Sequence, residues 1–443
     1  MSEYIEKIEN NGVSVYGLGY VGLTLAIVLA EHGYFVRGLD VDSNKISMLK
    51  RNLSYLHEKN IVSRLKNIRE KKLISFHSEL QNDKNKYIII CIGTPINYRT
   101  KKPIIKSIQK SLNPILNNVK ENQTLILRST VPIGFTKKYI VDQIHKKTSL
   151  KVGKNIFVCF APERTIEGKA LEELKSNPQI IGGYSEKCIQ NGIFFFQRIN
   201  HKIITVGNLE SAETAKLIDN SYRDTTFAFS NEIARICEKY NLNALNIIDA
   251  CNSDYKRNNI PKPSPGVGGA CLSKDPHILV DSASKKGFNS LVVKSSRSLN
   301  ESMISNISKK IIVLLNKVNN PKIIICGLAF KGNPETGDLR NSTSIEIINK
   351  IIKLNNKVNI FAYDPVLKKN EITKLGYKYC KPNFNSIKAD AIIFANNHNS
   401  FLNLDIIKII DNLSDKKILC DCWGLFSKVD LPLEKIKYFG VGF

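Results

Sequence analysis

Short apolar runs alternate with longer amphipathic stretches through the first half of the chain. The apolar runs predict strands at 13–17, 34–40, 87–93, 124–129 and 155–160. Helical stretches separate most of these runs, and such alternation is typical of a parallel sheet with helices on its faces. We therefore expect an N-terminal doubly wound domain over residues 1–207.

The alternation stops near residue 208. Residues 210–240 form one helical pattern without Gly or Pro, and a second helical stretch follows at 289–318. Strand-like runs return at 322–327, 358–364, 389–396 and 417–421. The expected fold class is α/β: two Rossmann-like doubly wound parallel-sheet domains, at 1–207 and 306–443, joined by a central helical domain at 208–305 with one long helix.

The net charge of the chain favours some classes of ligand over others. The 443 residues carry 65 Lys and Arg against 40 Asp and Glu, a net charge of +25. Such a charge favours anionic ligands, nucleic acids and nucleotides among them. The lysines are dispersed, and the chain has no helix-turn-helix, zinc-finger or RNA-binding signature, so we expect no nucleic acid partner.

Hydropathy and cysteine spacing bear on location and metals. No apolar run approaches the about 18 residues of a membrane span, and the first residues lack a signal-peptide pattern. We expect a cytoplasmic protein with reduced thiols and no membrane partner. Of the ten cysteines, only Cys420 and Cys422 are close in sequence, and we expect no metal site.

A glycine-rich turn follows the first predicted strand. It reads Gly17-Leu18-Gly19-Tyr20-Val21-Gly22 and opens a helix, and Asp40 closes the next strand. This is the full context of a dinucleotide-binding unit, in which the helix N-terminus holds the pyrophosphate. A carboxylate at position 40 would accept hydrogen bonds from ribose hydroxyls and repel a 2′-phosphate, so NAD is the expected cofactor.

Hydroxyls follow two later strands of the same predicted sheet. Thr94 in "CIGTP" and Thr130 in "RSTVPIG" come just after strands whose carboxyl ends should border the cofactor crevice. Either hydroxyl could instead cap a turn. The candidate cofactor-binding residues from these patterns are Gly17, Leu18, Gly19, Tyr20, Val21, Gly22, Asp40, Thr94 and Thr130.

Polar pairs with the spacing of one helical turn are candidates for chemistry. Glu163 and Glu167 could act as acid or base, or could be favourable acids at a helix start. Lys216 and Asn220 share a helix face and could stabilise an oxyanion, or form an ordinary polar patch.

The segment "PGVGGACLSKDP" at 265–276 contains Cys271 behind a run of glycines. This thiol could be a nucleophile, a metal ligand or a small residue in a bend. Glycines such as Gly266 and Gly268 permit close approach of backbone and ligand.

Six segments together resemble the nucleotide-sugar 6-dehydrogenase family, which includes UDP-glucose, GDP-mannose and UDP-N-acetylhexosamine dehydrogenases. In family order they read "GLGYVG", "STVPIG", "PERTIEG", "AETAKLIDNSYRD", "PGVGGACLSKDP" and "GLAFKGNPETGDLRNS". The resemblance implies oxidation of a sugar CH2OH to a carboxylate, with two NAD reduced per turnover. It implies Cys271 as the nucleophile, through a thiohemiacetal and then a thioester.

The resemblance also implies roles for other residues. Lys216 and Asn220 would steady an oxyanion, and Asp275 would assist proton transfer around the sulfur or water. Glu167 would act as base or position water, with Thr130 beside the same water. Candidate substrate-binding residues are Glu163, Arg164, Lys216, Asn220, Arg257, Gly266, Gly268 and Lys331, the last toward the sugar or its diphosphate. The resemblance also adds Lys45, Lys274 and Arg340 to the candidate cofactor-binding residues.

Three residues bear on which sugar is oxidised. Val267, Ala270 and Arg257 resemble the UDP-N-acetylhexosamine branch, which predicts UDP-GlcNAc or UDP-ManNAc as substrate and supply of a surface polysaccharide. Glu167 is typical of the UDP-glucose branch, which is the alternative. A catalytically silent sensor of NAD or nucleotide sugar is a further alternative. By resemblance, the helix at 210–240 suggests a homodimer.

Overall fold

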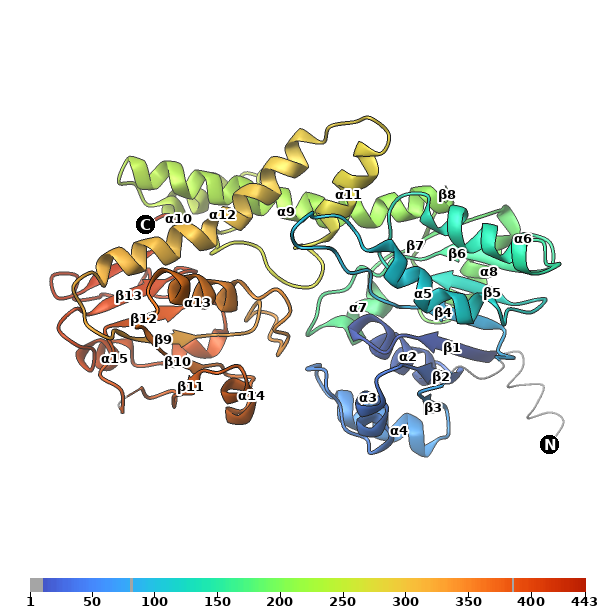
Figure 1. Cartoon of the computed structure of the whole chain (residues 1–443), viewed down its shortest axis with the longest axis horizontal. Coiled ribbons are helices and arrows are strands. Elements are labelled where there is room, and N and C mark those ends of the chain that lie inside the picture. Colours follow the sequence, from blue (N-terminus) through green and yellow to red (C-terminus); the bar gives the residue numbers. More distant parts are fainter. Residues whose placement is uncertain (1–10, 80–82, 385) are drawn as a thin grey trace. The chain divides into compact units, whose positions relative to one another are not determined.

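The computed structural model describes residues 11–79, 83–384 and 386–443. The chain divides into two compact units. Unit 1 runs to Asp219 and also contains His277–Asn289, and unit 2 comprises Asn220–Pro276 and Ser290–Phe443. The boundaries fall within two helices, α9 (Leu209–Lys239) and α11 (Asp275–Ser284), so each helix supplies residues to both units (Figure 1).

Unit 1 is built on an eight-stranded sheet in the order β3-β2-β1-β4-β5-β6-β7-β8. The strands are β1 (Gly12–Tyr16), β2 (Phe35–Leu39), β3 (Ile74–His77), β4 (Tyr87–Ile90), β5 (Thr124–Leu127), β6 (Phe157–Phe160), β7 (Gln179–Gly183) and β8 (Ile203–Asn208). Neighbouring strands are parallel except β6 and β7, which are antiparallel. The predicted parallel sheet is therefore confirmed, with one reversal near its far edge.

Helices cover both faces of this sheet because its central strands are apolar on both sides. On β4 and β5, Ile89 and Ile126 pack into one core, whereas Ile88 and Leu125 pack into the other. The first core receives α2 (Tyr20–Glu31), α4 (Ile61–Glu70), α7 (Ala170–Ser176) and α8 (Glu186–Phe196). The second receives α5 (Ile105–Leu116), η1 (Thr136–Val141) and α6 (Asp142–Lys147).

Unit 2 repeats this strand order in a six-stranded parallel sheet, β11-β10-β9-β12-β13-β14. The strands are β9 (Lys322–Cys326), β10 (Asn359–Tyr363), β11 (Lys378–Tyr379), β12 (Ala391–Phe394), β13 (Ile418–Asp421) and β14 (Lys437–Gly440). One face packs against α12 (Leu291–Leu314), α13 (Thr343–Leu354) and residues of α9, and the other packs against η2 (Asn399–Asn403) and α15 (Ile406–Asp411). The second Rossmann-like sheet is thereby confirmed.

The first turn of unit 2's sheet copies that of unit 1. The N–H of Gly327 after β9 donates to the carbonyl of Tyr363 at 2.8 Å, as the N–H of Gly17 after β1 donates to Leu39 at 2.8 Å. Asp364 follows β10 and accepts four backbone N–H groups. They belong to Leu328, Ala329, Val366 and Leu367, at 2.7, 3.0, 2.9 and 3.2 Å.

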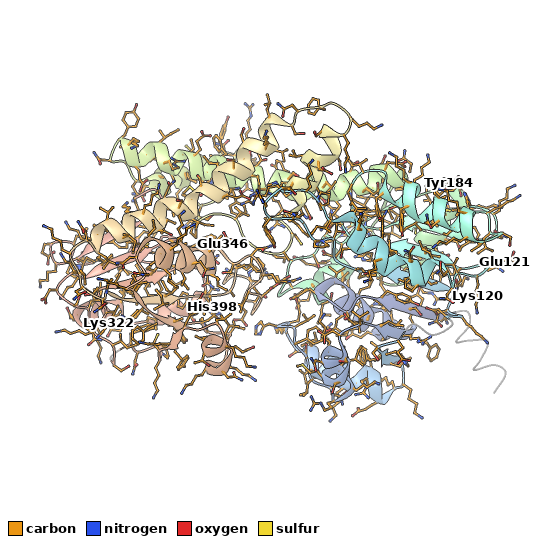
Figure 2. The ribbon with its side chains drawn as sticks, in the orientation of Figure 1. Lys120, Glu121, Tyr184, Lys322, Glu346 and His398 are labelled. Carbon is orange, nitrogen blue, oxygen red and sulfur yellow. The ribbon has the colours of Figure 1, made fainter. Side chains whose placement is uncertain are left out.

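The helical segment that follows β8 and precedes β9 in the sequence contains the 31-residue helix α9, as expected from its uninterrupted pattern, and the 24-residue helix α12. In the described part of the chain, no helix has the length and apolar character needed to cross a membrane. Basic and acidic side chains occur side by side on the surface, as with Lys120 and Glu121 in unit 1 (Figure 2).

Candidate functional site

A pocket of about 450 Å³ lies in unit 1 where the strand order reverses between β1 and β4. This is the position at which doubly wound sheets bind ligands. Gly17, Gly19, Asp40 and Lys45 of the predicted cofactor set line it.

The glycine turn is shaped by close backbone packing. A Cβ at Gly22 would lie 1.9 Å from the Gly17 carbonyl oxygen, so only glycine allows α2 to pack this closely against the turn. At Gly19, by contrast, a Cβ would meet no heavy atom within 4 Å. Open space beside the first turn of α2 is what a pyrophosphate on a helix N-terminus requires.

Asp40 is held in place by the chain itself. Its Oδ2 accepts the Leu18 N–H at 2.8 Å, its Oδ1 accepts the Asp42 N–H at 3.0 Å, and the Lys45 ammonium lies 3.5 Å away. The carboxylate is thus fixed at the pocket wall, at the strand end where a dinucleotide-binding unit places the acid for the ribose.

Thr94 supplies an independent test of whether the crevice fits a dinucleotide. Its hydroxyl is buried and has no hydrogen-bond partner among the residues that the structure describes. A buried hydroxyl without a partner costs about 1–3 kcal/mol, which a bound polar ligand would recover. Together with the open space at Gly19 and the fixed Asp40 carboxylate, this site fits NAD.

Lys216 and Glu163 meet within unit 1. The Lys216 ammonium donates to the Glu163 carbonyl at 2.5 Å and lies 3.7 Å from its carboxylate, and both side chains are buried. Neighbouring Arg164 is paired with Asp219 at 2.7 Å. Glu167 and Thr130 are half-buried.

Sequence reasoning missed Glu58, which joins the cofactor helix to the loop containing Glu163 and Glu167. Its Oε1 accepts the Gly168 N–H at 2.6 Å and the Tyr20 hydroxyl. The same hydroxyl accepts the Gly168 N–H at 2.6 Å. Burial and the Glu58 carboxylate raise the pKa of Tyr20, so its hydroxyl stays protonated. No local spacing relates Glu58 to Gly168, which is 110 residues away.

Glu213 is a second residue that the sequence did not single out. Its carboxylate accepts the N–H groups of Gly134 at 2.5 Å and Thr136 at 2.7 Å, and the Thr136 hydroxyl at 2.6 Å. It thereby fixes the end of the "STVPIG" turn that contains Thr130. Burial raises the pKa of Glu213 to about 7, against the opposing effect of these hydrogen bonds.

In unit 2, Cys271 lies in the turn that precedes α11 and is half-buried. Its carbonyl accepts the N–H groups of Lys274 at 3.0 Å and Asp275 at 2.9 Å. Asp275 is fully buried, and its carboxylate accepts Asn220 Nδ2 at 2.6 Å and Lys274 Nζ at 2.5 Å. Four of the predicted residues, Asn220, Cys271, Lys274 and Asp275, are therefore neighbours.

The glycines before Cys271 lie close to backbone atoms of other segments of unit 2. A Cβ at Gly268 would lie 2.4 Å from the Asn341 carbonyl oxygen, and one at Gly266, where φ is +110°, would lie 2.7 Å from that of Asn300. These glycines therefore let the loop pack against the chain's own backbone. That they also let a ligand approach the loop stays a prediction.

The other thiols show what burial does to a cysteine. Burial raises the pKa of Cys91 and of Cys380 to about 12, which keeps both protonated at neutral pH. Within the part of the chain that the structure describes, none of the ten cysteines forms a disulfide. Among the described residues, no cluster of three His, Cys, Asp or Glu side chains could hold a metal ion.

Three remaining candidates of unit 2 lie nearer the surface. Arg257 is exposed, Lys331 Nζ lies 5.6 Å from the centre of the Phe330 ring, and Arg340 is exposed and paired with Asp338 at 2.5 Å.

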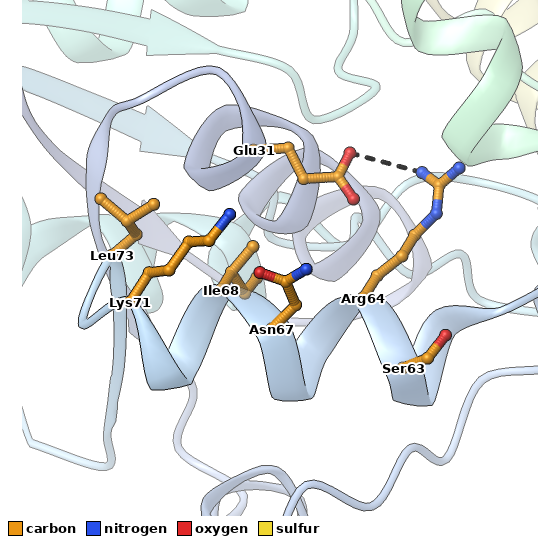
Figure 3. A pocket seen from close by; sticks show the side chains of 7 residues that line it. All are labelled: Glu31, Ser63, Arg64, Asn67, Ile68, Lys71 and Leu73. Carbon is orange, nitrogen blue, oxygen red and sulfur yellow. Dashed lines mark hydrogen bonds and ion pairs between the residues drawn. The ribbon is translucent and has the colours of Figure 1, made fainter.

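A second hollow in unit 1, of about 260 Å³, contains none of the predicted site residues. It lies along α4, and the ion pair of Glu31 and Arg64, 3.4 Å long, spans it (Figure 3). Its charged side chains are of both signs, and two of them already form this ion pair. We therefore assign no ligand to this hollow.

Comparisons with known proteins agree with an NAD-binding domain, a central helical domain and a second Rossmann-like domain. Three models of the UDP-glucose/GDP-mannose dehydrogenase family match: the NAD binding domain at 11–200, the central domain at 210–302 and the UDP binding domain at 324–428. The chain is similar to UDP-N-acetyl-D-mannosamine dehydrogenase of Methanococcus vannielii, with 31% identity over 94% of this chain and 93% of that protein.

Solved structures give the same result. The structure of UDP-D-ManNAc dehydrogenase from Pyrococcus horikoshii is 28% identical and has a TM-score of 0.86, over 97% of this chain and 99% of that one. A UDP-glucose dehydrogenase from Pyrobaculum islandicum, 21% identical, shares the fold with a TM-score of 0.85 over 98% of each chain. The chain is therefore an NAD-dependent nucleotide-sugar dehydrogenase and belongs to the UDP-glucose/GDP-mannose dehydrogenase family.

Proposed function

We propose that this enzyme oxidises C6 of a UDP-N-acetylhexosamine from CH2OH to carboxylate, with UDP-ManNAc as the first substrate to test. The observation that carries the chemistry is the half-buried Cys271 in a loop whose following carboxylate, Asp275, is held by Asn220 at 2.6 Å. A simple alcohol oxidation needs no thiol, whereas oxidation to the acid needs a group that retains the aldehyde.

Cys271 is assigned the covalent steps. Its thiolate adds to the C6 aldehyde to give a thiohemiacetal, and oxidation of that adduct gives a thioester. Water then hydrolyses the thioester, releasing the carboxylate and the free thiol. NAD, when bound, is the two-electron acceptor for each oxidation. Two NAD are consumed per sugar.

The polar residues are assigned to charge and proton handling. Lys216 and Asn220 donate hydrogen bonds to the oxygen that becomes negative as C6 turns tetrahedral. Asp275 accepts the thiol proton, and Glu167 with Thr130 orients the hydrolytic water. Burial supports these roles for Lys216, Asn220 and Asp275, because a charge or amide in a dry site acts more strongly than one in water.

The choice of sugar rests on the relatives. The M. vannielii and P. horikoshii proteins, at 31% and 28% identity, are both named for UDP-N-acetylmannosamine. The motif residues Val267, Ala270 and Arg257 support the same branch. UDP-glucose stays the competing substrate, because the fold is shared with a UDP-glucose dehydrogenase. We propose one role for each domain. The domain at 1–207 binds NAD, the domain at 208–305 holds the cysteine loop, and the domain at 306–443 binds the UDP-sugar.

A homodimer through α9 is part of this proposal. Tyr222, Phe229 and Ile236 are spaced seven residues apart on α9, and their exposed fractions are 68%, 52% and 48%. Apolar residues at this spacing form the seam along which two helices pack. A second copy of the chain is the proposed occupant. Light scattering on a Phe229→Asp variant should then show a monomer where the parent is a dimer, and a parent monomer would contradict this.

The experiment that tests the activity counts NADH per sugar. UDP-ManNAc, UDP-GlcNAc, UDP-glucose and GDP-mannose are supplied in limiting amounts with excess NAD. Two NADH per sugar are expected with a UDP-N-acetylhexosamine, and none from the Cys271→Ser variant as a completed reaction. One NADH per sugar would overturn the mechanism, and preference for UDP-glucose would overturn the assigned sugar. NAD binding without turnover of any sugar would indicate a sensor.

A further inference from the structure

Arg297 of α12 holds the loop of Cys271 on both sides of the thiol. Its Nη2 donates to the carbonyl of Val267 at 3.0 Å, and its Nη1 donates to that of Leu272 at 3.1 Å. Val267 lies four residues before Cys271, and Leu272 directly follows Cys271. One buried guanidinium therefore joins the two backbone segments that flank the thiol.

The guanidinium is itself fixed by Asp224. Arg297 Nη1 lies 2.7 Å from Asp224 Oδ1, and both side chains are buried. Asn300 Nδ2 donates to the same Oδ1 at 2.9 Å and to the Asp224 carbonyl at 2.8 Å. Because arginine and asparagine three residues apart share a face of α12, both reach one carboxylate.

The same face of α9 holds the other end of the loop. Asp224 follows Asn220 by one helical turn, and Asn220 Nδ2 donates to Asp275 at 2.6 Å. The residues at 267, 272 and 275 are thus all anchored, directly or through Arg297, to one turn of α9. Cys271 lies inside this span.

A second polar chain fixes where the loop begins. Asn300 Oδ1 accepts Asn231 Nδ2 at 2.9 Å, and Asn231 Oδ1 accepts the Ser264 N–H at 2.8 Å. The network therefore runs without a break from Ser264, at the entry of the loop, to Arg297.

Stability alone does not account for such an arrangement. Buried ion pairs are costly to desolvate, and well-packed apolar side chains of similar volume are often equally stabilising. An apolar side chain could not hold two carbonyl oxygens in fixed positions. A lysine would keep the charge, but its ammonium lacks the planar fork that reaches two separate acceptors.

We propose that Arg297 is a positioning residue for the nucleophile: it sets the backbone on both sides of Cys271 and so the direction in which the thiol points. The inference rests on the proposed function, in which Cys271 forms the covalent intermediates. Arg297 needs no contact with substrate or cofactor for this role. Loss of the fork should therefore reduce kcat and change the reactivity of the thiol while leaving the KM for both substrates within about threefold.

The test uses the full-length enzyme with exposed Cys251 changed to Ser. Alkylation by iodoacetamide is followed on the peptide that contains Cys271 by mass spectrometry, because Cys91 is half-buried as well. Arg297→Lys is compared with Lys310→Met, a change elsewhere on α12 that removes an exposed ion pair with Glu238 of α9. In Arg297→Lys we expect kcat to fall by tenfold or more and the pH profile of alkylation to shift. Lys310→Met should match the parent in both.

A folded Arg297→Lys variant with kcat within twofold of the parent and an unchanged alkylation profile would overturn the proposal. If Arg297→Lys does not fold, Asp224→Asn replaces it, because the amide keeps one acceptor for Arg297 but loses the charge. It should then lower kcat by at least threefold, and parent-like kcat and alkylation would again overturn the proposal. Cys271→Ser is measured in parallel. If it still completes turnover, the proposed function fails, whereas the alkylation profile still decides whether Arg297 positions the thiol.

Discussion

Asn220 donates a hydrogen bond of 2.6 Å to the buried carboxylate of Asp275, 55 residues further along the chain. This bond fixes the acid that follows Cys271 and commits one amide hydrogen of Asn220 to it. The other amide hydrogen is the one available to an oxyanion in the proposed mechanism.

Replacing Asn220 by Asp should therefore do more than delete a donor. Two carboxylates within hydrogen-bonding distance cannot both ionise, so the pKa of one would rise. We expect kcat at pH 8 to fall by about a hundredfold or more and the pH–rate profile to gain an ionisation. Asn246→Asp, an exposed change on α10 (Ala244–Asn252), is the matched control. A parent-like profile for Asn220→Asp would contradict the role.

Glu213 makes a prediction about stability and pH. Its pKa is raised from 4.5 to about 7 in the folded chain, so the folded state binds this proton more tightly than the unfolded state. The stabilisation is complete below pH 4.5 and is lost as pH rises toward 7, by at most about 3 kcal/mol. Urea unfolding between pH 4.5 and 7.5 should show this slope in the parent and a flatter one in Glu213→Gln. Parallel slopes would show that Glu213 does not titrate there.

Glu58 and Tyr20 should be energetically coupled. Removing the Glu58 charge by Gln weakens its bonds to the Gly168 N–H and the Tyr20 hydroxyl, and should cost about 1–3 kcal/mol of unfolding free energy. Tyr20→Phe should cost part of the same energy, so the double variant should be less destabilised than the sum. A double-mutant cycle by urea denaturation measures this, and strict additivity would argue against a shared junction.

Gly268→Ala should displace the cysteine loop, chiefly through a clash with the backbone of another segment. The new methyl group would lie 2.4 Å from the Asn341 carbonyl oxygen, so the backbone must shift. We expect a loss of kcat of at least about tenfold, because small displacements of a nucleophile cost large factors in rate. Gly337→Ala, where the nearest side-chain atom would be 3.4 Å away, is the control and should be active. Equal activity of the two variants would refute this reading of the loop.

Strand positions followed closely from the apolar runs wherever those runs were long. The predicted strand at 87–93 is β4 at Tyr87–Ile90, and the helix predicted at 210–240 is α9 at Leu209–Lys239. Other strands were missed because their local signal is weak. Strand β7 ends in two glycines, and β8 has exposed as well as half-buried residues, so neither has a continuous apolar run.

The residues of the candidate site also fall into those that the sequence identified and those that it did not. Cys271, Asp275 and Asn220 were found because each belongs to a recognisable segment. Glu58 and Arg297 belong to no such segment, and their partners are distant in sequence or are backbone carbonyls. Every residue has a backbone carbonyl. A side chain that donates to one therefore has no partner residue of a particular type that a sequence pattern could reveal.

The two glycine turns, at Gly17 and at Gly327, are built alike, with an acid after the second strand of each sheet. Each acid accepts N–H groups of the glycine turn on one carboxylate oxygen and of its own turn on the other, with two such bonds at Asp40 and four at Asp364. Asp40 in addition lines a pocket. The acid therefore ties the two turns together whether or not a ligand contacts it, so a motif search that scores the acid alone identifies the architecture and not the binding site.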